Sequence, residues 1–136
     1  MAYRHSKSID METKSNKQIV ADFYRDIIRD QKLELLDEYV HDNYIQHSPM
    51  LKDGKAALLE ALNYLKAMPK PAVPGPSPIA RMIAEDDLVM AHLDISFMGK
   101  RRAVVDIFRL KDGKVVEHWD VQQDVPEVMP HGNGMF

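Results

Sequence analysis

Hydrophobic residues in the first half of the chain recur at helical spacing and predict the first two helices. In the first helix, which Ser15 or Asn16 can cap, they are Ile19, Val20, Phe23, Tyr24, Ile27 and Ile28. Leucines mark a second, shorter helix between residues 33 and 40. The segment from Tyr44 to Pro49 follows it, and its proline favours extended rather than helical backbone.

A third helix and a set of strands complete the pattern. The helix begins at Asp53-Gly54 and ends by Met68, because Pro69 cannot continue it. Prolines are frequent between residues 69 and 78, which predicts a stiff extended loop. The spacing then changes to that of strands, which are expected at residues 79–85, 88–97, 102–110 and 114–123.

Helices followed by an antiparallel meander predict an α+β fold, with three N-terminal helices packed on a curved antiparallel sheet. The length of 136 residues suits one domain. Residues 1–14 are polar and are expected to form a flexible tail, and residues 15–136 a single domain.

Composition narrows the classes of function. The chain has no cysteine, which excludes disulfides and cysteine-ligated metal sites. A net charge of −3 with scattered basic residues argues against nucleic-acid binding. No signal peptide and no stretch of about 20 apolar residues is present, so no membrane association is expected and the cytoplasm is the expected location.

Polar side chains recur on the last three strands. Alternation along a strand allows five of them to share one face: His92, Asp94, Asp106, His118 and Asp120. The turn at residues 111–113 decides the pairing of the last two strands. A three-residue loop, which we favour, places Asp106 opposite His118, with Asp120 one step along. A two-residue turn would place Asp106 opposite Trp119.

A sheet face with this many carboxylates and imidazoles is costly to bury unless the groups are paired or hydrated. It therefore predicts a cavity that holds water or a polar ligand, with Tyr24 and Tyr44 on the helix side, His47 at the mouth and Trp119 as wall. In the alternative interpretation these polar side chains face solvent and the apolar residues of the same strands pack on the helices. The histidines lack metal-ligand spacing, so no metal is expected.

The opposite sheet face would carry apolar residues of the last two long strands. Val105, Ile107 and Val121 share it, and exposed apolar sheet faces usually mark an interface. A second copy of the chain is the expected partner, which would make the protein a homodimer through this outer face.

At these residues the chain resembles SnoaL-like polyketide cyclases, within the nuclear transport factor 2-like superfamily. The resemblance covers roughly residues 16–136. Its segments are Tyr44-Ile45-Gln46-His47-Ser48-Pro49, Asp53-Gly54-Lys55, Val105-Asp106-Ile107-Phe108-Arg109, Asp112 to Asp120 and Asn133-Gly134-Met135-Phe136. The last segment is similar to small bacterial members described as aldol-condensation enzymes. The resemblance implies a cone-shaped α+β barrel, a homodimer, a hydrophobic pocket and no cofactor.

The resemblance also implies roles for single residues. Asp106 sits where the ketosteroid isomerase family keeps a protonated aspartate, and Asp120 matches the final-strand aspartate of the cyclase and epoxide hydrolase families. His92 and Asp94 sit where the hydrolases keep an Arg-x-Asp pair, so His92 departs from that pattern. The isomerase general base has no match here, which argues against isomerisation of that kind.

Together these residues predict a cofactor-free lyase or isomerase that acts on a small, largely apolar carbonyl compound. The reaction would be an aldol-type cyclisation, or proton abstraction with enolate stabilisation. Asp120 would be the base, His92 the polarising acid and Asp106 a second donor to the enolate. The alternative is a non-catalytic module that binds a small ligand in the same pocket.

Overall fold

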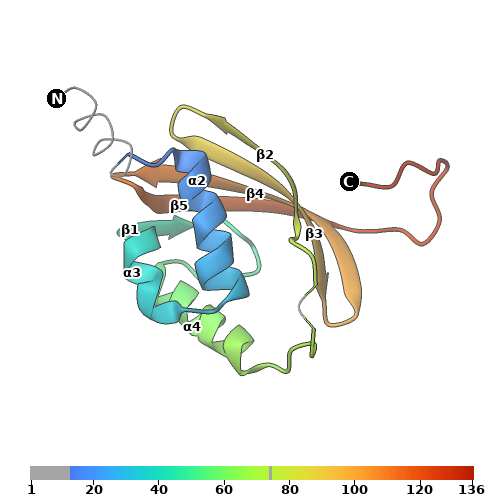
Figure 1. Ribbon diagram of the computed structural model, residues 1–136, viewed down its shortest axis with the longest axis horizontal. Helices are drawn as coiled ribbons and strands as arrows, with labels where there is room; N and C mark the ends of the chain where they lie inside the picture. The colour runs from blue at the N-terminus through green and yellow to red at the C-terminus, as the bar shows by residue number, and fades with distance from the viewer. Residues whose placement is uncertain (1–12, 74) are drawn as a thin grey trace.

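The computed structural model describes residues 13–73 and 75–136 and combines helices with one mixed sheet (Figure 1). The helical elements are α2 (Asn16–Phe23), the π-helical η1 (Tyr24–Arg29) that continues it, the 3-10 helix η2 (Leu33–Leu35), α3 (Leu36–Tyr39) and α4 (Lys55–Ala67). The strands are β1 (Val40–Gln46), β2 (Ile79–Glu85), β3 (Leu88–Phe97), β4 (Lys100–Lys111) and β5 (Lys114–Asp124). Most of the tail expected at residues 1–14 lies outside the described residues.

The strands lie in the order β1-β5-β4-β3-β2, and only β1 runs parallel to its neighbour. Helices α2, α3 and α4 cover one face of this curved sheet (Figure 1). The expected α+β fold with three N-terminal helices is confirmed, and α2 begins where Ser15 accepts a hydrogen bond from the backbone of Gln18. Within the described residues, no helix is both long enough and apolar enough to cross a membrane.

Strand β1 is the element that the sequence pattern does not reveal. Its buried residues Val40 and Tyr44 are separated by three polar positions, and its pairing with β5 shifts register between Val40 and Ile45. The regular alternation of an ordinary half-buried strand is therefore missing. The segment forms a strand because it pairs with the edge strand β5, and this pairing is a tertiary contact.

Two hairpin turns are shorter than expected. Phe97 pairs with Lys100 around Met98-Gly99, and Lys111 pairs with Lys114 around Asp112-Gly113. Both central residues of each turn have positive φ, between 52° and 78°, which is the geometry of the tight turn that suits twisted hairpins. Glycine at the second position takes this conformation without steric cost. The shorter turn at Met98-Gly99 changes which face of β3 lies beside each face of β4, whereas in the β4–β5 pair a register shift between Arg109 and Leu110 compensates for the shorter turn.

The core lies between the inner face of the sheet and the helices. Alternate residues of β3, Val89, Ala91 and Leu93, are fully buried and pack in one cluster with Val20 and Ile27 of the long N-terminal helix. Burying a side chain of this size typically contributes about 1.5–3 kcal/mol. The apolar residues of β3 therefore face the helices.

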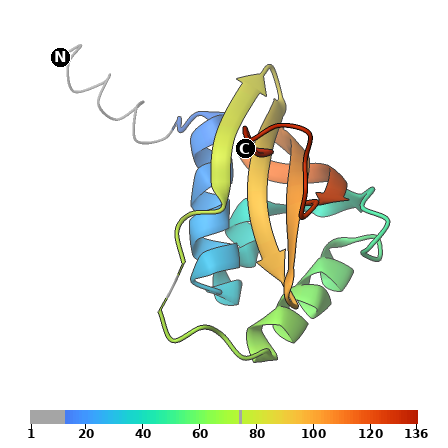
Figure 2. The same ribbon diagram turned by 90° about the vertical axis from the view of Figure 1, so that its right-hand side faces the viewer.

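The C-terminal tail folds back over the outer face of the sheet. In Figure 2 the red tail lies in front of the strands, with the helices behind them. Its last residue, Phe136, stacks on the ring of His92 at 5.4 Å between centroids, and the guanidinium of Arg101 lies 5.0 Å from the same ring. The tail thus covers the β3 side of the outer face.

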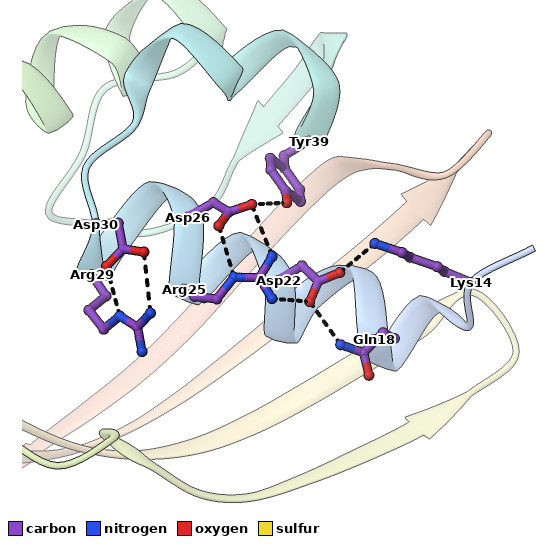
Figure 3. A network of polar contacts seen from close by, with 8 residues as sticks. All are labelled: Lys14, Gln18, Asp22, Arg25, Asp26, Arg29, Asp30 and Tyr39. Atoms are coloured by element: carbon purple, nitrogen blue, oxygen red, sulfur yellow. Dashed lines mark hydrogen bonds and ion pairs between the residues drawn. The ribbon is translucent and has the colours of Figure 1, made fainter. Parts of the chain in front are cut away.

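A polar network ties the N-terminal helix to α3 (Figure 3). Asp22 accepts hydrogen bonds from Lys14, Gln18 and Arg25. Asp26 accepts from Arg25 and, at 2.5 Å, from the Tyr39 hydroxyl. Hydrogen bonds from Arg25 and Tyr39 hold the pKa of Asp26 well below its usual value, and burial followed by the bond to Asp26 raises the pKa of Tyr39 to about 12.

We expect Asp26→Asn to lower the free energy of unfolding by about 1–2 kcal/mol at neutral pH, because hydrogen bonds to a charged acceptor are lost. Urea denaturation followed by circular dichroism measures this loss. Since folding lowers the pKa of Asp26, its contribution is complete above about pH 5 and is lost as the pH falls below about 4, the unfolded value. The difference between wild type and variant therefore shrinks in acid.

Asp30→Asn, at the C-cap of the same helix, is the matched control. Asp30 is more exposed and pairs with Arg29, whose side chain is largely in solvent, so its removal changes stability little. Equal losses for the two variants, or a difference that grows in acid, would contradict the assigned role of Asp26.

Candidate active site

A cavity of about 460 Å³ lies between the inner face of the sheet and the helices. This volume falls in the range of small-molecule sites. Apolar side chains supply most of its wall, among them Phe23, Ile28, Leu58, Leu62, Val104 and Phe108. Its polar groups come chiefly from β1, β4, β5 and the N-terminal helix. The mouth is bordered by the exposed side chains of Met50 and Phe97.

Strands β4 and β5 bring three ionisable groups to this cavity. Asp106 pairs with Asp120, and Phe108 with His118, so the three groups share the inner face. Both registers considered from the sequence are wrong, because neither His118 nor Trp119 lies opposite Asp106. The turn has two residues, and an irregularity between Arg109 and Leu110 then shifts the register by one more residue.

Asp106 lies at the centre of a hydrogen-bonded chain. The Tyr24 hydroxyl donates to Oδ2 of Asp106 at 2.5 Å, and Nε2 of His118 lies 2.9 Å from Oδ1. Burial, followed by the charge of Asp106, raises the pKa of Tyr24 well above its usual value, so Tyr24 stays protonated as a donor. Tyr24 reaches the sheet from the first position of the π-helical segment η1.

Gln46 holds the other end of this chain. Its Oε1 accepts from the backbone N–H of Ser48 at 3.0 Å and lies 2.6 Å from Nδ1 of His118. Its Nε2 donates to the Tyr44 hydroxyl at 2.7 Å. Tyr44 and Gln46 alternate on β1 and both line the cavity. Sequence reasoning missed Gln46, although its spacing of two from Tyr44 was a signal that both share a face.

The Asp120 carboxylate has fewer and longer hydrogen bonds than that of Asp106. Within the described residues, its carboxylate accepts one hydrogen bond, from Gln122 at the long distance of 3.4 Å. It lines the cavity among apolar groups, and its charge adds to burial and the charge of Asp106 in raising the pKa of both Tyr24 and Tyr44. A carboxylate with free lone pairs at a ligand cavity is placed to accept a proton.

The same trio is the group that could hold a cation. Ligand atoms of Asp106, His118 and Asp120 all lie within 4.8 Å of one another. Both nitrogens of His118 already face hydrogen-bond partners, so a metal would have to displace the contact with Asp106. The expectation that the protein works without metal or cofactor stays a prediction.

Two residues predicted for the site, His92 and Asp94, lie on the outer face of the sheet, away from the cavity. Because Phe97 pairs with Lys100, Ala91 and not His92 lies opposite Asp106. The expectation that His92 and Asp94 share a face with Asp106 is therefore wrong. His92 contacts Arg81 and the ring of Phe136, and Asp94 forms a two-pronged ion pair with Arg101 at 2.8 and 2.9 Å.

His47 and Trp119 also lie on the outer face. Their rings stack in parallel, 4.9 Å apart, and Nε2 of His47 lies 2.7 Å from Glu117. Arg109 joins this group by contacting both Glu117 and the Trp119 ring. Of the residues predicted for the site, the structure brings five to the cavity: Tyr24, Tyr44, Asp106, His118 and Asp120.

The fold is that of nuclear transport factor 2-like proteins. It is similar to an NTF2-like protein of unknown function from Cytophaga hutchinsonii, with a TM-score of 0.67 and 15% identity over 82% of this chain and 92% of that chain. It is also similar to IdmH, a proposed polyketide cyclase from Streptomyces antibioticus, with a TM-score of 0.61 and 19% identity over 80% and 92%.

A third similar structure is a proposed ketosteroid isomerase from Kribbella flavida, with a TM-score of 0.64 and 16% identity over 85% of this chain and 83% of that chain. No curated protein sequence matches this chain. The model of the SnoaL-like polyketide cyclase family matches residues 18–128, so the chain belongs to that family. The predicted family is therefore confirmed.

Proposed function

We propose that this protein is a cofactor-free lyase or isomerase that removes a proton next to the carbonyl group of a small, largely apolar compound. The observation that carries the proposal is the position of Asp120: its weakly hydrogen-bonded carboxylate lies in an apolar cavity, directly across the β4–β5 ladder from Asp106. Membership of the polyketide cyclase family supports a carbonyl substrate.

In the proposed reaction Asp120 takes the α-proton. The electron pair of the broken C–H bond forms a C=C bond, and the carbonyl π pair moves to oxygen to give an enolate. Reprotonation at another carbon would complete an isomerisation, and attack of the enolate on a second carbonyl would complete an aldol-type ring closure. The apolar wall excludes water, which strengthens every electrostatic interaction with the developing charge.

Asp106 and His118 limit the negative charge beside the enolate. Oδ1 of Asp106 and Nε2 of His118 approach to 2.9 Å, so one proton must lie between them, because two lone pairs would repel at this distance. The pair is neutral overall whether that proton is on oxygen or on nitrogen. Asp106 can then stand next to a developing enolate without repelling it as a free carboxylate would.

We expect Asp120→Asn to reduce proton abstraction by about 10²–10⁴-fold, because the amide cannot act as the base. The measurement is deuterium exchange at the α-carbon of 2-tetralone, a small apolar ketone, in deuterium oxide followed by proton NMR. The affinity for 2-tetralone, measured by fluorescence or NMR titration, should change little because the shape of the cavity is kept.

The matched control is Asp42→Asn, a strand aspartate whose side chain is 91% exposed, and it should exchange like wild type. Exchange that survives in Asp120→Asn would show that another group is the base. If wild type binds 2-tetralone without exchanging its protons at a rate above that of buffer, the alternative of a non-catalytic binding module is favoured instead.

We also propose that two copies of the chain pair through the outer face of the sheet. Ile107 packs beside Trp119 and Val105 beside Val121 across the β4–β5 ladder, and Val121 remains 66% exposed in the single chain. The C-terminal tail covers the β3 side of this face and leaves the β5 side open. A two-fold axis over β5 would bury the apolar residues of both copies.

Val121→Glu should convert a dimer into a monomer, because two buried like charges would face each other across the axis. Sedimentation velocity measures the change, and circular dichroism checks that the fold is kept. Val73→Glu, at a still more exposed valine in the proline-rich loop, is the control and should stay dimeric. A wild-type protein that sediments as a monomer would rule out this interface.

A further inference from the structure

We propose that Tyr44 is the hydrogen-bond donor to the substrate carbonyl oxygen, and that Gln46 is the positioning residue that aims the Tyr44 hydroxyl hydrogen into the cavity. This inference rests on the proposed function, which needs a donor to the developing enolate oxygen. His92, the donor expected from the sequence, lies on the other face of the sheet.

The direction of the Gln46 amide is fixed by the backbone. The N–H of Ser48 can only donate, so the amide atom 3.0 Å away from it is assigned as the accepting oxygen. Ser48 is itself buried, which removes water as a competing partner. The same oxygen lies 2.6 Å from Nδ1 of His118, so Nδ1 carries a hydrogen. The amide nitrogen of Gln46 must then point the other way.

That nitrogen donates to the oxygen of Tyr44 at 2.7 Å. An N–H that donates to a hydroxyl occupies a lone pair of its oxygen and leaves the hydroxyl hydrogen to point elsewhere. Within residues 13–73 and 75–136, no hydrogen bond has the Tyr44 hydroxyl as its donor. Tyr44 is only 6% exposed and lines the cavity, so this hydrogen is a buried donor that a ligand oxygen can satisfy.

Two other acid–base groups of the cavity, Tyr24 and the Asp106–His118 pair, already have partners for their protons. The Tyr24 hydroxyl donates to Asp106, and the proton between Asp106 and His118 is shared by those two residues. Tyr44 also keeps its hydrogen, because burial and the nearby charge of Asp106 raise its pKa. Of these acid–base groups, Tyr44 is therefore the one whose hydrogen is free to reach a carbonyl oxygen while Asp120 takes the α-proton.

The chemical step is balanced with these two residues alone. The C–H bond to the α-carbon breaks and its proton forms an O–H bond with Asp120. The electron pair moves through the carbon atoms to the carbonyl oxygen, which becomes an enolate oxygen. The Tyr44 hydroxyl gives this oxygen a hydrogen bond that is stronger in the transition state than in the ketone, which is the requirement for catalysis.

Two variants test the inference with 2-tetralone as the probe. Tyr44→Phe should slow α-proton exchange by about 10²–10³-fold, the usual effect of losing one oxyanion donor. Gln46→Glu should slow it comparably although it keeps the Tyr44 hydroxyl. The new carboxylate still accepts from Ser48 and His118, but its second oxygen accepts the Tyr44 hydrogen instead of donating to Tyr44.

A direct readout of the hydrogen bond accompanies the rates. With carbon-13 at its carbonyl, 2-tetralone should show a downfield carbonyl shift when bound to wild type, and this shift should be lost in both variants. Tetralin, which lacks the oxygen, should bind wild type and both variants alike, which shows that the cavity is intact. Tyr64→Phe, at a tyrosine that is 68% exposed, is the control and should behave as wild type.

Failure of the inference differs from failure of the proposed function. Exchange that depends on Asp120 but is unchanged in Tyr44→Phe, with the carbonyl shift retained, would overturn the role of Tyr44 and leave the function standing. Wild type could also show the carbonyl shift without exchanging any protons, while both variants lose the shift. That result would support Tyr44 as the donor and overturn the proposed reaction. A shift retained in Gln46→Glu would overturn the positioning role of Gln46.

Discussion

The length of the turn at Met98-Gly99 determines which side chains of β3 share the inner face of the sheet with those of β4. Because the turn has two residues, Phe97 pairs with Lys100, and the fully buried Ala91 and Leu93 share the inner face with Asp106 and its neighbours. A slip of one residue would place His92 opposite Asp106, so that these two would share one face and Ala91 and Leu93 would lie on the other face. The contribution of β3 to the cavity depends on this register, which is fixed by a two-residue turn with positive φ at both central residues. The polar groups of β5 depend on the separate pairing of β4 with β5.

Burying polar groups in such a cavity is costly unless each finds a partner. Here one continuous chain of hydrogen bonds runs from the Ser48 backbone through Gln46, His118 and Asp106 to Tyr24. The chain begins at a backbone group that can only donate, which fixes the direction of the Gln46 amide and the hydrogen on Nδ1 of His118. Asp120 is outside the chain, and that difference is why Asp120, and not Asp106, is the proposed base.

The sequence predicted what depends on local spacing. Strands β2 and β3 have the bounds expected from alternation, the N-terminal helix begins after Ser15, and His118 and Asp120 share a face as alternation along one strand requires. It could not predict what depends on pairing. The inward face of β3 follows from the length of a turn, and the strand character of β1 follows from its contact with β5. The role of Gln46 follows from an amide orientation that only tertiary contacts reveal.

The charge of the site also narrows the kind of ligand that the proposed reaction can use. If one proton lies between Asp106 and His118, the inner end of the cavity carries one net negative charge, on Asp120. An anionic ligand would meet that charge in an apolar setting where little screens it. Arg102, the cation that lines the mouth, is already paired with Asp124 at 2.9 Å. A neutral ketone is not repelled by Asp120 and needs no cation to pair with. Negative charge develops on it only in the transition state, at the oxygen that Tyr44 can reach.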